Sequence, residues 1–286
     1  MVEISVTEDE KRQGRLAPGR HQEAVEAIRR DGLVVLADLI DLGHIEVLRE
    51  RMVEDSQKLL QRKDRPFNWN PGNLQQNPPP EAPFLFRDVL VNDVVISVTQ
   101  AILGRGLKNG FYSGNTALPS DQRQPVHADI GQLWPDLIVA HPAYGLVVNV
   151  PLVDMDERNG STEVWPGTHT DTTVAFQDGE ITIPAEVLER QRAVQPPLQP
   201  KVRAGSFLVR DIRMWHAGMP NRTEQPRPMM AMIHSVSWWP TSALKFPKGT
   251  EGVFEHPDLN WHIDFTEGPI DHISEPQAYA YREVRS

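Results

Sequence analysis

Apolar and polar positions alternate with different periods in the two parts of the chain. In the first part, apolar side chains recur at helical spacing over residues 20–32, 43–63 and 91–104. Gly32 closes the first of these segments, as glycine often does at the end of a helix. Residues 33–40 form an almost continuous apolar run, which predicts a buried strand between the first two helices.

The second part of the chain consists of short apolar runs separated by Gly, Pro, Asn and Asp. Many short strands with turn residues between them are typical of a β-sandwich or barrel. One helix, at residues 184–194, interrupts the predicted strands. The runs themselves lie at residues 110–119, 143–154, 161–166, 172–176, 180–184, 205–211 and 228–239.

This pattern predicts a polar tail at residues 1–20 followed by a single domain, residues 21–286. The strand-rich core covers about residues 107–240, after a layer of helices, and an irregular segment wraps around it at the C-terminal end. Residues 64–83 carry six prolines and many amides, which indicates a binding loop or a lid.

The composition is that of an ordinary globular protein, with 39% hydrophobic and 24% charged residues. No stretch approaches the about 18 apolar residues of a membrane helix, and the charged N-terminus lacks the apolar core of a secretory signal, so we expect a cytoplasmic location and no membrane partner. The net charge of −10 disfavours nucleic acid and mildly favours a cationic small molecule, although solubility alone explains many acidic proteins. Without cysteine, metal ligands are limited to His, Asp and Glu.

A His-x-Asp pair suits a metal site, but it occurs four times here. Non-haem Fe(II) oxygenases bind iron through two histidines and one carboxylate on a double-stranded β-helix, also called a jelly roll or cupin-like core, with several strands between the pair and the second histidine. Only the pair His127/Asp129 is followed by a second histidine, His216, with several predicted strands in between. The sequence therefore predicts His127, Asp129 and His216 as the metal ligands. The pairs are His127/Asp129, His169/Asp171, His256/Asp258 and His262/Asp264.

An arginine and several polar or aromatic residues accompany this triad in the sequence. Arg227 enters the strand after His216 and could form a bidentate pair with a dicarboxylic co-substrate; Arg222, the competing choice, lies in a turn. The candidates for the wall of a substrate pocket, for which core packing is the alternative, are Trp134, Trp69, Gln75 and Gln76.

Four segments resemble, in order, the motifs of the phytanoyl-CoA dioxygenase (PhyH) family of Fe(II)/2-oxoglutarate oxygenases. The chain looks most similar to antibiotic-biosynthesis members of that family such as kanamycin B dioxygenase. The resemblance implies that the triad holds iron and that Arg227 binds the C5 carboxylate of 2-oxoglutarate. The segments are YSGNTALP (112–119), QPVHAD (124–129), VPLVDMDERNGSTEVWPGTH (150–169) and RMWHAGMPNRTEQPRP (213–228).

The same resemblance implies further contacts and an activity. Gln124 and Asn115 match amides near the metal-chelating end of 2-oxoglutarate, and Thr162 is a further contact to the co-substrate. Gly218 departs from the family, since many relatives have serine there. The implied reaction uses O2, with ascorbate as activator, to hydroxylate a C–H bond or convert an amine into a ketone; the carboxylate of Asp129 argues against halogenation.

The substrate class stays open at this point. A cationic or polyhydroxylated molecule, for example in aminoglycoside-type antibiotic biosynthesis, is the first expectation; an acyl-CoA, an alkaloid or an amino acid is the alternative. A cupin-like metal-binding protein without oxygenase activity would use the same triad. A metal-dependent hydrolase would require a nearby general base, and the sequence has no His-Glu-x-x-His helix.

Overall fold

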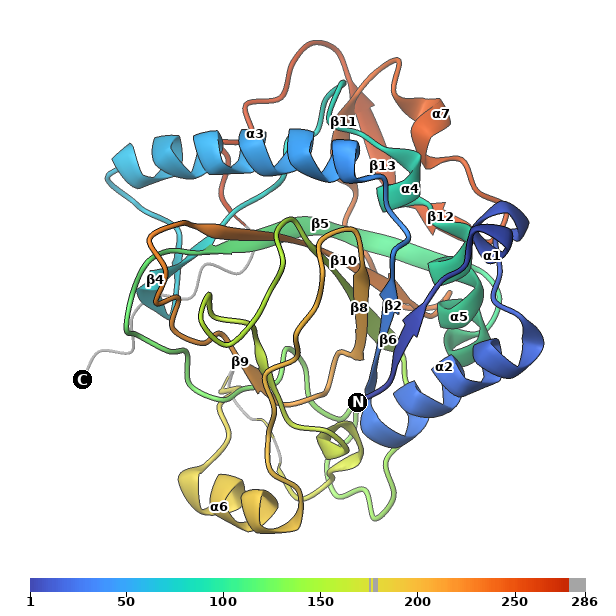
Figure 1. Ribbon diagram of the computed structural model, residues 1–286, viewed down its shortest axis with the longest axis vertical. Helices are drawn as coiled ribbons and strands as arrows, with labels where there is room; N and C mark the ends of the chain where they lie inside the picture. Colours follow the sequence, from blue (N-terminus) through green and yellow to red (C-terminus); the bar gives the residue numbers. More distant parts are fainter. Residues whose placement is uncertain (175, 177–179, 278–286) are drawn as a thin grey trace.

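A long mixed β-sheet forms the centre of the molecule (Figure 1). The computed structural model describes residues 1–174, 176 and 180–277. The sheet has the strand order β1-β2-β8-β6-β10-β5-β4-β3, and β12 pairs with β5. Its strands are β1 (Glu3–Ser5), β2 (Leu33–Ala37), β3 (Phe67–Asn68), β4 (Asn70–Gln75), β5 (Leu107–Ala117), β6 (Gly145–Pro151), β8 (Phe207–Asp211), β10 (Arg227–Ser235) and β12 (Leu259–Trp261).

A shorter set of strands faces the four central strands β8, β6, β10 and β5. It contains β7 (Glu163–Val164) and β9 (His216–Ala217), which pair with each other. Isolated bridges join His127 to His216 and Val164 to Leu198. Two facing sheets of this connectivity form a double-stranded β-helix, so the predicted fold class, mainly β with flanking helices, is confirmed.

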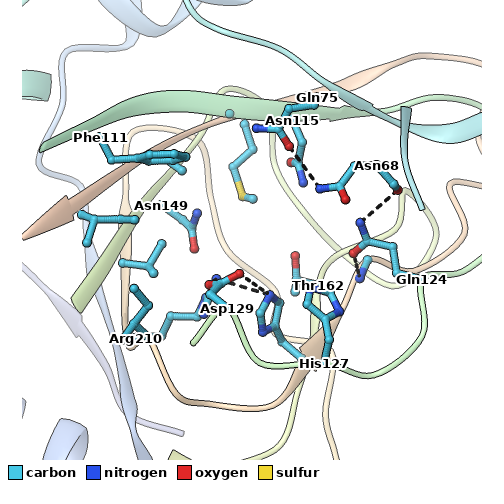
Figure 2. Close-up of a pocket in the computed structure, with 18 of the residues that line it drawn as sticks. Asn68, Gln75, Phe111, Asn115, Gln124, His127, Asp129, Asn149, Thr162 and Arg210 are labelled. Carbon is cyan, nitrogen blue, oxygen red and sulfur yellow. Dashed lines mark hydrogen bonds and ion pairs between the residues drawn. The ribbon is translucent and has the colours of Figure 1, made fainter. Parts of the chain in front are cut away.

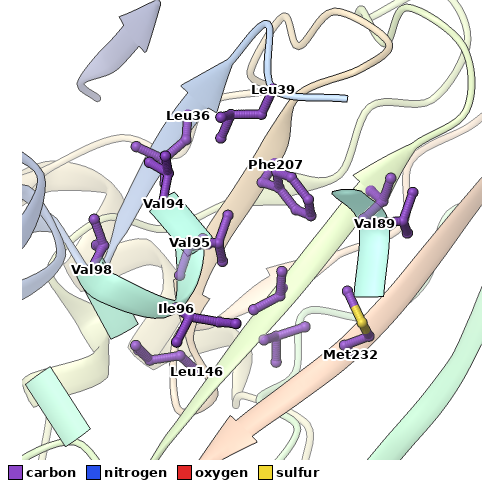
Figure 3. Close-up of a cluster of buried hydrophobic side chains, with 14 of the residues drawn as sticks. Leu36, Leu39, Val89, Val94, Val95, Ile96, Val98, Leu146, Phe207 and Met232 are labelled. Carbon is purple, nitrogen blue, oxygen red and sulfur yellow. The ribbon is translucent and has the colours of Figure 1, made fainter. Parts of the chain in front are cut away.

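Helices cover the outside of the long sheet (Figure 1). None of the helices in the described part of the chain is long and apolar enough to cross a membrane. Figure 1 shows α3 lying above β5 and β10. In Figure 3, Val94, Val95 and Ile96 of α5 lie in one apolar cluster with Leu36 and Phe207 of the sheet. The helices are α1 (Glu8–Gln13), α2 (Pro18–Asp31), α3 (Leu42–Gln61), α4 (Arg87–Leu90), α5 (Asp93–Leu103), α6 (Ala185–Val194), α7 (Glu251–Phe254) and a 3-10 turn (Thr168–Thr170).

Two segments are more regular than their composition predicts. Residues 1–20 are not a tail, because β1 pairs with β2 and the side chain of Thr7 caps α1. Residues 64–83 are not simply a loop, because β4 pairs with β5. Pro71 lies outside the paired residues of β4, and Pro78 follows the strand, so neither removes an N–H that the ladder needs.

Other predicted boundaries also change. The C-terminal segment is only partly irregular, since it adds β12 to the sheet edge and forms a small sheet of β11 (Leu244–Pro247) and β13 (Ile263–Thr266). Residues 180–184 form a single bridge, between Thr182 and His127, in place of the predicted strand. The predicted strand at 172–176 is absent from its described residues, and residue 175 lies outside them.

Candidate metal centre and active site

The three predicted metal ligands meet at one point. The backbones of His127 and His216 exchange two hydrogen bonds, of 2.9 and 2.8 Å, so their side chains leave the sheet on the same face, with ring centroids 4.3 Å apart. Asp129, two residues from His127, points to that face because the period of a strand is two. The ligand atoms of the three residues lie within 4.8 Å of one another. Among the described residues, these three form the group of His, Asp and Glu side chains whose ligand atoms are close enough together to hold a metal ion.

The other three His-x-Asp pairs do not build a comparable site in the described part of the chain. His169 contacts the backbone carbonyl of Arg29 at 3.1 Å. His256 pairs with Asp93, and His262 contacts the backbone of Thr241. Their histidines are thus used to hold loops and helices together.

Both imidazoles of the triad are oriented by backbone carbonyls. Nδ1 of His127 lies 2.8 Å from the carbonyl oxygen of Pro125, and Nδ1 of His216 lies 3.0 Å from that of Met214. A proton on Nδ1 of each ring donates to the carbonyl and leaves Nε2 unprotonated, as a metal ligand must be. Burial lowers the pKa of both histidines, which keeps the rings neutral and able to bind a cation.

Arg210, which the sequence analysis missed, binds the carboxylate of the third metal ligand, Asp129, and keeps it ionised. Its Nη2 donates to Oδ2 of Asp129 at 2.7 Å, and Nε2 of His216 lies 3.6 Å from Oδ1 of the same carboxylate. Burial raises the pKa of Asp129, but the positive charge of Arg210 and the hydrogen bond that it donates outweigh this effect and hold the pKa well below its usual range. A signal was present, because the charged Arg210 directly follows the apolar residues FLV inside a predicted strand.

A cavity opens beside the triad, and Figure 2 shows its walls. Four of the predicted co-substrate and substrate residues line it: Asn115, Gln124, Thr162 and Gln75. Amide groups gather on one side of the triad, where Asn68, Gln75, Asn115 and Gln124 lie. The apolar side chains that line the cavity are Phe111, Ile130, Val147, Ile212, Met229, Ala231 and Ile233.

Arg227 lies behind this cavity and does not line it. Its side chain is buried, with Nε donating to the carbonyl of Asn159 at 3.1 Å and Nη2 to that of Gly160 at 2.9 Å. Nη1 contacts the sulfur atoms of Met155 and Met229, and Met229 forms part of the cavity wall. Burial lowers the pKa of Arg227 to about 10. The role of Arg227 as a carboxylate anchor therefore stays a prediction, and it requires Met229 to move.

Three of the predicted pocket walls lie elsewhere. Gln76 points to the opposite face from Gln75, as neighbours in a strand do, and its amide donates to the carbonyl of Met52. Trp134 is 57% exposed to solvent and is not among the residues that line the cavity. Trp69 also stays outside the cavity lining, and its ring lies 5.4 Å from that of His127.

Gly218, the departure from the family pattern, is explained by Gln124. The backbone N–H of Gly218 donates to Oε1 of Gln124 at 2.7 Å. A Cβ atom at position 218 would lie 2.7 Å from that oxygen and 2.8 Å from Nδ2 of Asn73. The carboxamide of Gln124 thus fills the space into which a serine side chain would extend.

Comparison with known proteins is consistent with this architecture. Among curated proteins, the chain is similar to Dioxygenase af480 from Aspergillus fumigatus, with 28% identity over 54% of this chain and 46% of that protein, so it spans about half of the relative's length. The solved epimerase SnoN, in complex with Fe3+, alpha ketoglutarate and nogalamycin RO, is 17% identical, with a TM-score of 0.58 over 89% of this chain and 96% of that one.

HygX from Streptomyces hygroscopicus, solved with nickel, 2-oxoglutarate and hygromycin B bound, is 14% identical, with a TM-score of 0.56 over 84% of this chain and 96% of that one. At these identities the two solved structures establish the shared fold. The family model for phytanoyl-CoA dioxygenase (PhyH) matches residues 28–229, which include the triad, Arg210 and Arg227. The chain belongs to the phytanoyl-CoA dioxygenase (PhyH) family.

Proposed function

We propose that this protein is a non-haem Fe(II)- and 2-oxoglutarate-dependent dioxygenase that oxidises a C–H bond of a small molecule. The observation that carries the proposal is the convergence of one ligand atom each from His127, His216 and Asp129, all within 4.8 Å of one another. Two imidazoles and one carboxylate on one face are the ligand set of this enzyme class. Iron bound there supplies the activation of O2 that couples decarboxylation of 2-oxoglutarate to oxidation of the substrate.

The protein's own groups prepare the site for these ligands. The carbonyls of Pro125 and Met214 hold the two imidazoles, and Arg210 holds Asp129 ionised. Oδ1 of Asn115, buried at the cavity wall, has no hydrogen-bond partner among the described residues. A polar ligand in this position would satisfy it.

The co-substrate would lie on the amide side of the cavity. Gln124, Asn115 and Thr162 line that space, which agrees with their proposed role as contacts to 2-oxoglutarate. Arg227 would then bind the C5 carboxylate after Met229 moves aside. An intact carboxylate at Asp129 keeps the third ligand position filled, which favours hydroxylation, or conversion of an amine into a ketone, over halogenation.

The proposed substrate is a small molecule of secondary metabolism, such as an antibiotic precursor. SnoN and HygX, which share the fold, were solved with nogalamycin RO and hygromycin B respectively. Asp129 is the acidic residue among the described residues that line the cavity, and its carboxylate already forms an ion pair with Arg210. A cavity of this kind favours a polyhydroxylated substrate over a cationic one, because an ammonium group would find no free acidic partner.

Turnover of 2-oxoglutarate without a primary substrate tests the proposal. The full chain with Fe(II), ascorbate and O2 should release succinate slowly, and His216→Ala should abolish the release because a metal ligand is lost. His262→Ala, which alters an exposed histidine of a rejected pair, is the matched control. A wild-type protein that binds metal without consuming 2-oxoglutarate would support the cupin-like alternative, and activity in the strict absence of oxygen would support a hydrolase.

A further inference from the structure

Two buried guanidinium groups lie at opposite ends of the barrel interior. Arg227 begins β10, and Ile233 lies six residues further along the same strand, a distance of about 20 Å at the usual rise of a strand. Ile233 pairs with Val147, which in turn pairs with Arg210 of β8. Arg210 therefore belongs to a different end of the cavity from the predicted C5-carboxylate anchor.

Arg210, in the wall of the cavity, has a donor without a partner among the described residues. Its side chain is 7% exposed and lines the cavity, and Nη2 is occupied by Asp129 at 2.7 Å. Nη1 is buried and has no hydrogen-bond partner among the described residues. A buried cationic donor without an acceptor is costly, and the planar guanidinium suits a carboxylate oxygen as the missing acceptor.

Charge accounting points to the same acceptor. The two charges of iron(II) cancel those of 2-oxoglutarate, and Asp129 cancels one arginine. If Arg227 and Arg210 both serve the cavity, one positive charge remains once iron and co-substrate are bound. A monoanionic ligand would neutralise it, whereas a polycationic amino sugar would add to it.

The surroundings of Arg210 suit the carbon skeleton of such a ligand. Figure 2 places Phe111 and Asn149 on the same side of the cavity as Arg210, away from Gln124. Ile212 also lines the cavity. This side therefore combines one cation and one amide with apolar walls. We propose that the primary substrate is a small acid whose carboxylate accepts a hydrogen bond from Nη1 of Arg210; the inference rests on the proposed function and narrows its substrate class.

Both the co-substrate and the primary substrate could supply a carboxylate, so the experiment measures the two separately. The full chain is loaded with Ni(II), which does not support turnover, and with 2-oxoglutarate. Cyclohexanecarboxylate and its uncharged amide, cyclohexanecarboxamide, are then titrated by calorimetry. We expect the wild type to bind the acid about tenfold more tightly than the amide, the effect of one charge-assisted hydrogen bond.

Three variants assign that preference to its source. Arg210→Gln, titrated at Ni(II) and 2-oxoglutarate concentrations that saturate the variant, should abolish the preference for the acid over the amide. Arg210→Lys, which keeps the charge, should retain part of the preference. Arg222→Gln, which removes the same charge from an exposed turn, should behave as the wild type. Thermal melting of each variant checks that it is folded.

Two results would overturn the inference. One is equal binding of acid and amide by the wild type. The other is a loss of 2-oxoglutarate binding in Arg210→Gln with the acid preference intact, which would make Arg210 a co-substrate ligand. If the wild type binds neither Ni(II) nor 2-oxoglutarate, the proposed function fails instead, and the same comparison of acid and amide on metal-free protein still decides the role of Arg210.

Discussion

Arg210 and Arg227 lie in the same barrel, but their donors have different partners. Arg227 donates to two backbone carbonyls and touches two methionine sulfurs, so its environment is that of a structural residue. Arg210 donates to a carboxylate at the metal centre and keeps Nη1 unpaired among the described residues. The difference shows that burial alone does not distinguish a structural arginine from one that binds a ligand; the partners of each nitrogen do.

The largest expected effect tests the structural character of Arg227. Arg227→Ala removes the donors to the carbonyls of Asn159 and Gly160 and leaves both acceptors unsatisfied beside a new cavity. The free energy of unfolding should fall by about 3 kcal/mol, measured by urea denaturation of the metal-free protein. Arg222→Ala, in an exposed turn, should change it by less than about 0.5 kcal/mol. A stable Arg227→Ala protein would show that the arginine is held for ligand binding alone.

The pH dependence of the free energy of unfolding reports on buried histidines in two places, the metal site and strand β10, which also carries Arg227. His234, on β10, is buried against Thr99, and burial lowers its pKa to about 3. The unfolded chain takes up a proton below about pH 6.5 that the folded chain does not, so stability is lost as the pH falls. His234 alone should cost about 2 kcal/mol between pH 6.5 and pH 5.

Loading the protein with Ni(II) should change this pH dependence of stability. The pKa values of His127 and His216 are also lowered by burial, so both contribute to the loss in the metal-free protein. Bound Ni(II) should make their share of the loss larger and leave that of His234 unchanged, because coordinated imidazoles stay deprotonated in the folded protein while the unfolded chain still takes up both protons. The check is urea denaturation at several pH values with and without Ni(II); an unchanged pH dependence on loading would argue against the triad as the metal site.

Replacing Gly218, two residues after His216, tests the packing on the side of the cavity proposed for 2-oxoglutarate. Gly218→Ser places a side chain against the amides of Gln124 and Asn73, whose flexible ends must shift. The expected cost is about 1 kcal/mol in thermal denaturation, together with weaker 2-oxoglutarate binding because Gln124 is displaced. Gly19→Ser, where a Cβ atom meets nothing within 4 Å, is the matched control. Tighter binding of 2-oxoglutarate would mean that serine adopts the role it has in many relatives.

The smallest expected effect completes the comparison of the two arginines. Arg210→Ala in the metal-free protein leaves Asp129, whose side chain is 34% exposed, in contact with water. The free energy of unfolding should therefore change by about 1 kcal/mol or less, clearly below the effect at Arg227. Equal losses in the two variants, measured by the same urea denaturation, would remove the distinction between them.

Part of the site could be predicted because it depends on local spacing. His127 and Asp129 share a face since they lie two residues apart, and the number of strands before His216 selects this pair over the other three. Gln124 and Asn115 were found through the resemblance to the family. Each of these inferences needed only the identity and order of residues along the chain.

Other residues could not be placed because their partners are distant in sequence. Arg210 lies 81 positions from Asp129, and only the pairing of β8 with β6 brings it into the cavity. Gln75 and Gln76 are chemically alike, but the register of β4 against β5 turns one toward the cavity and the other toward Met52. Trp134 was expected near the substrate because it follows the metal pair, and it is exposed instead.

The sequence by itself determined the class of fold and the three converging ligands, because apolar periodicity and the His-x-Asp spacing are local properties of strands. The tertiary structure decided which arginine lines the cavity, which amide faces it and why position 218 has no side chain. These depend on strand register and on close packing between segments far apart in the chain, and a shift of one residue in register would exchange the two faces of a strand.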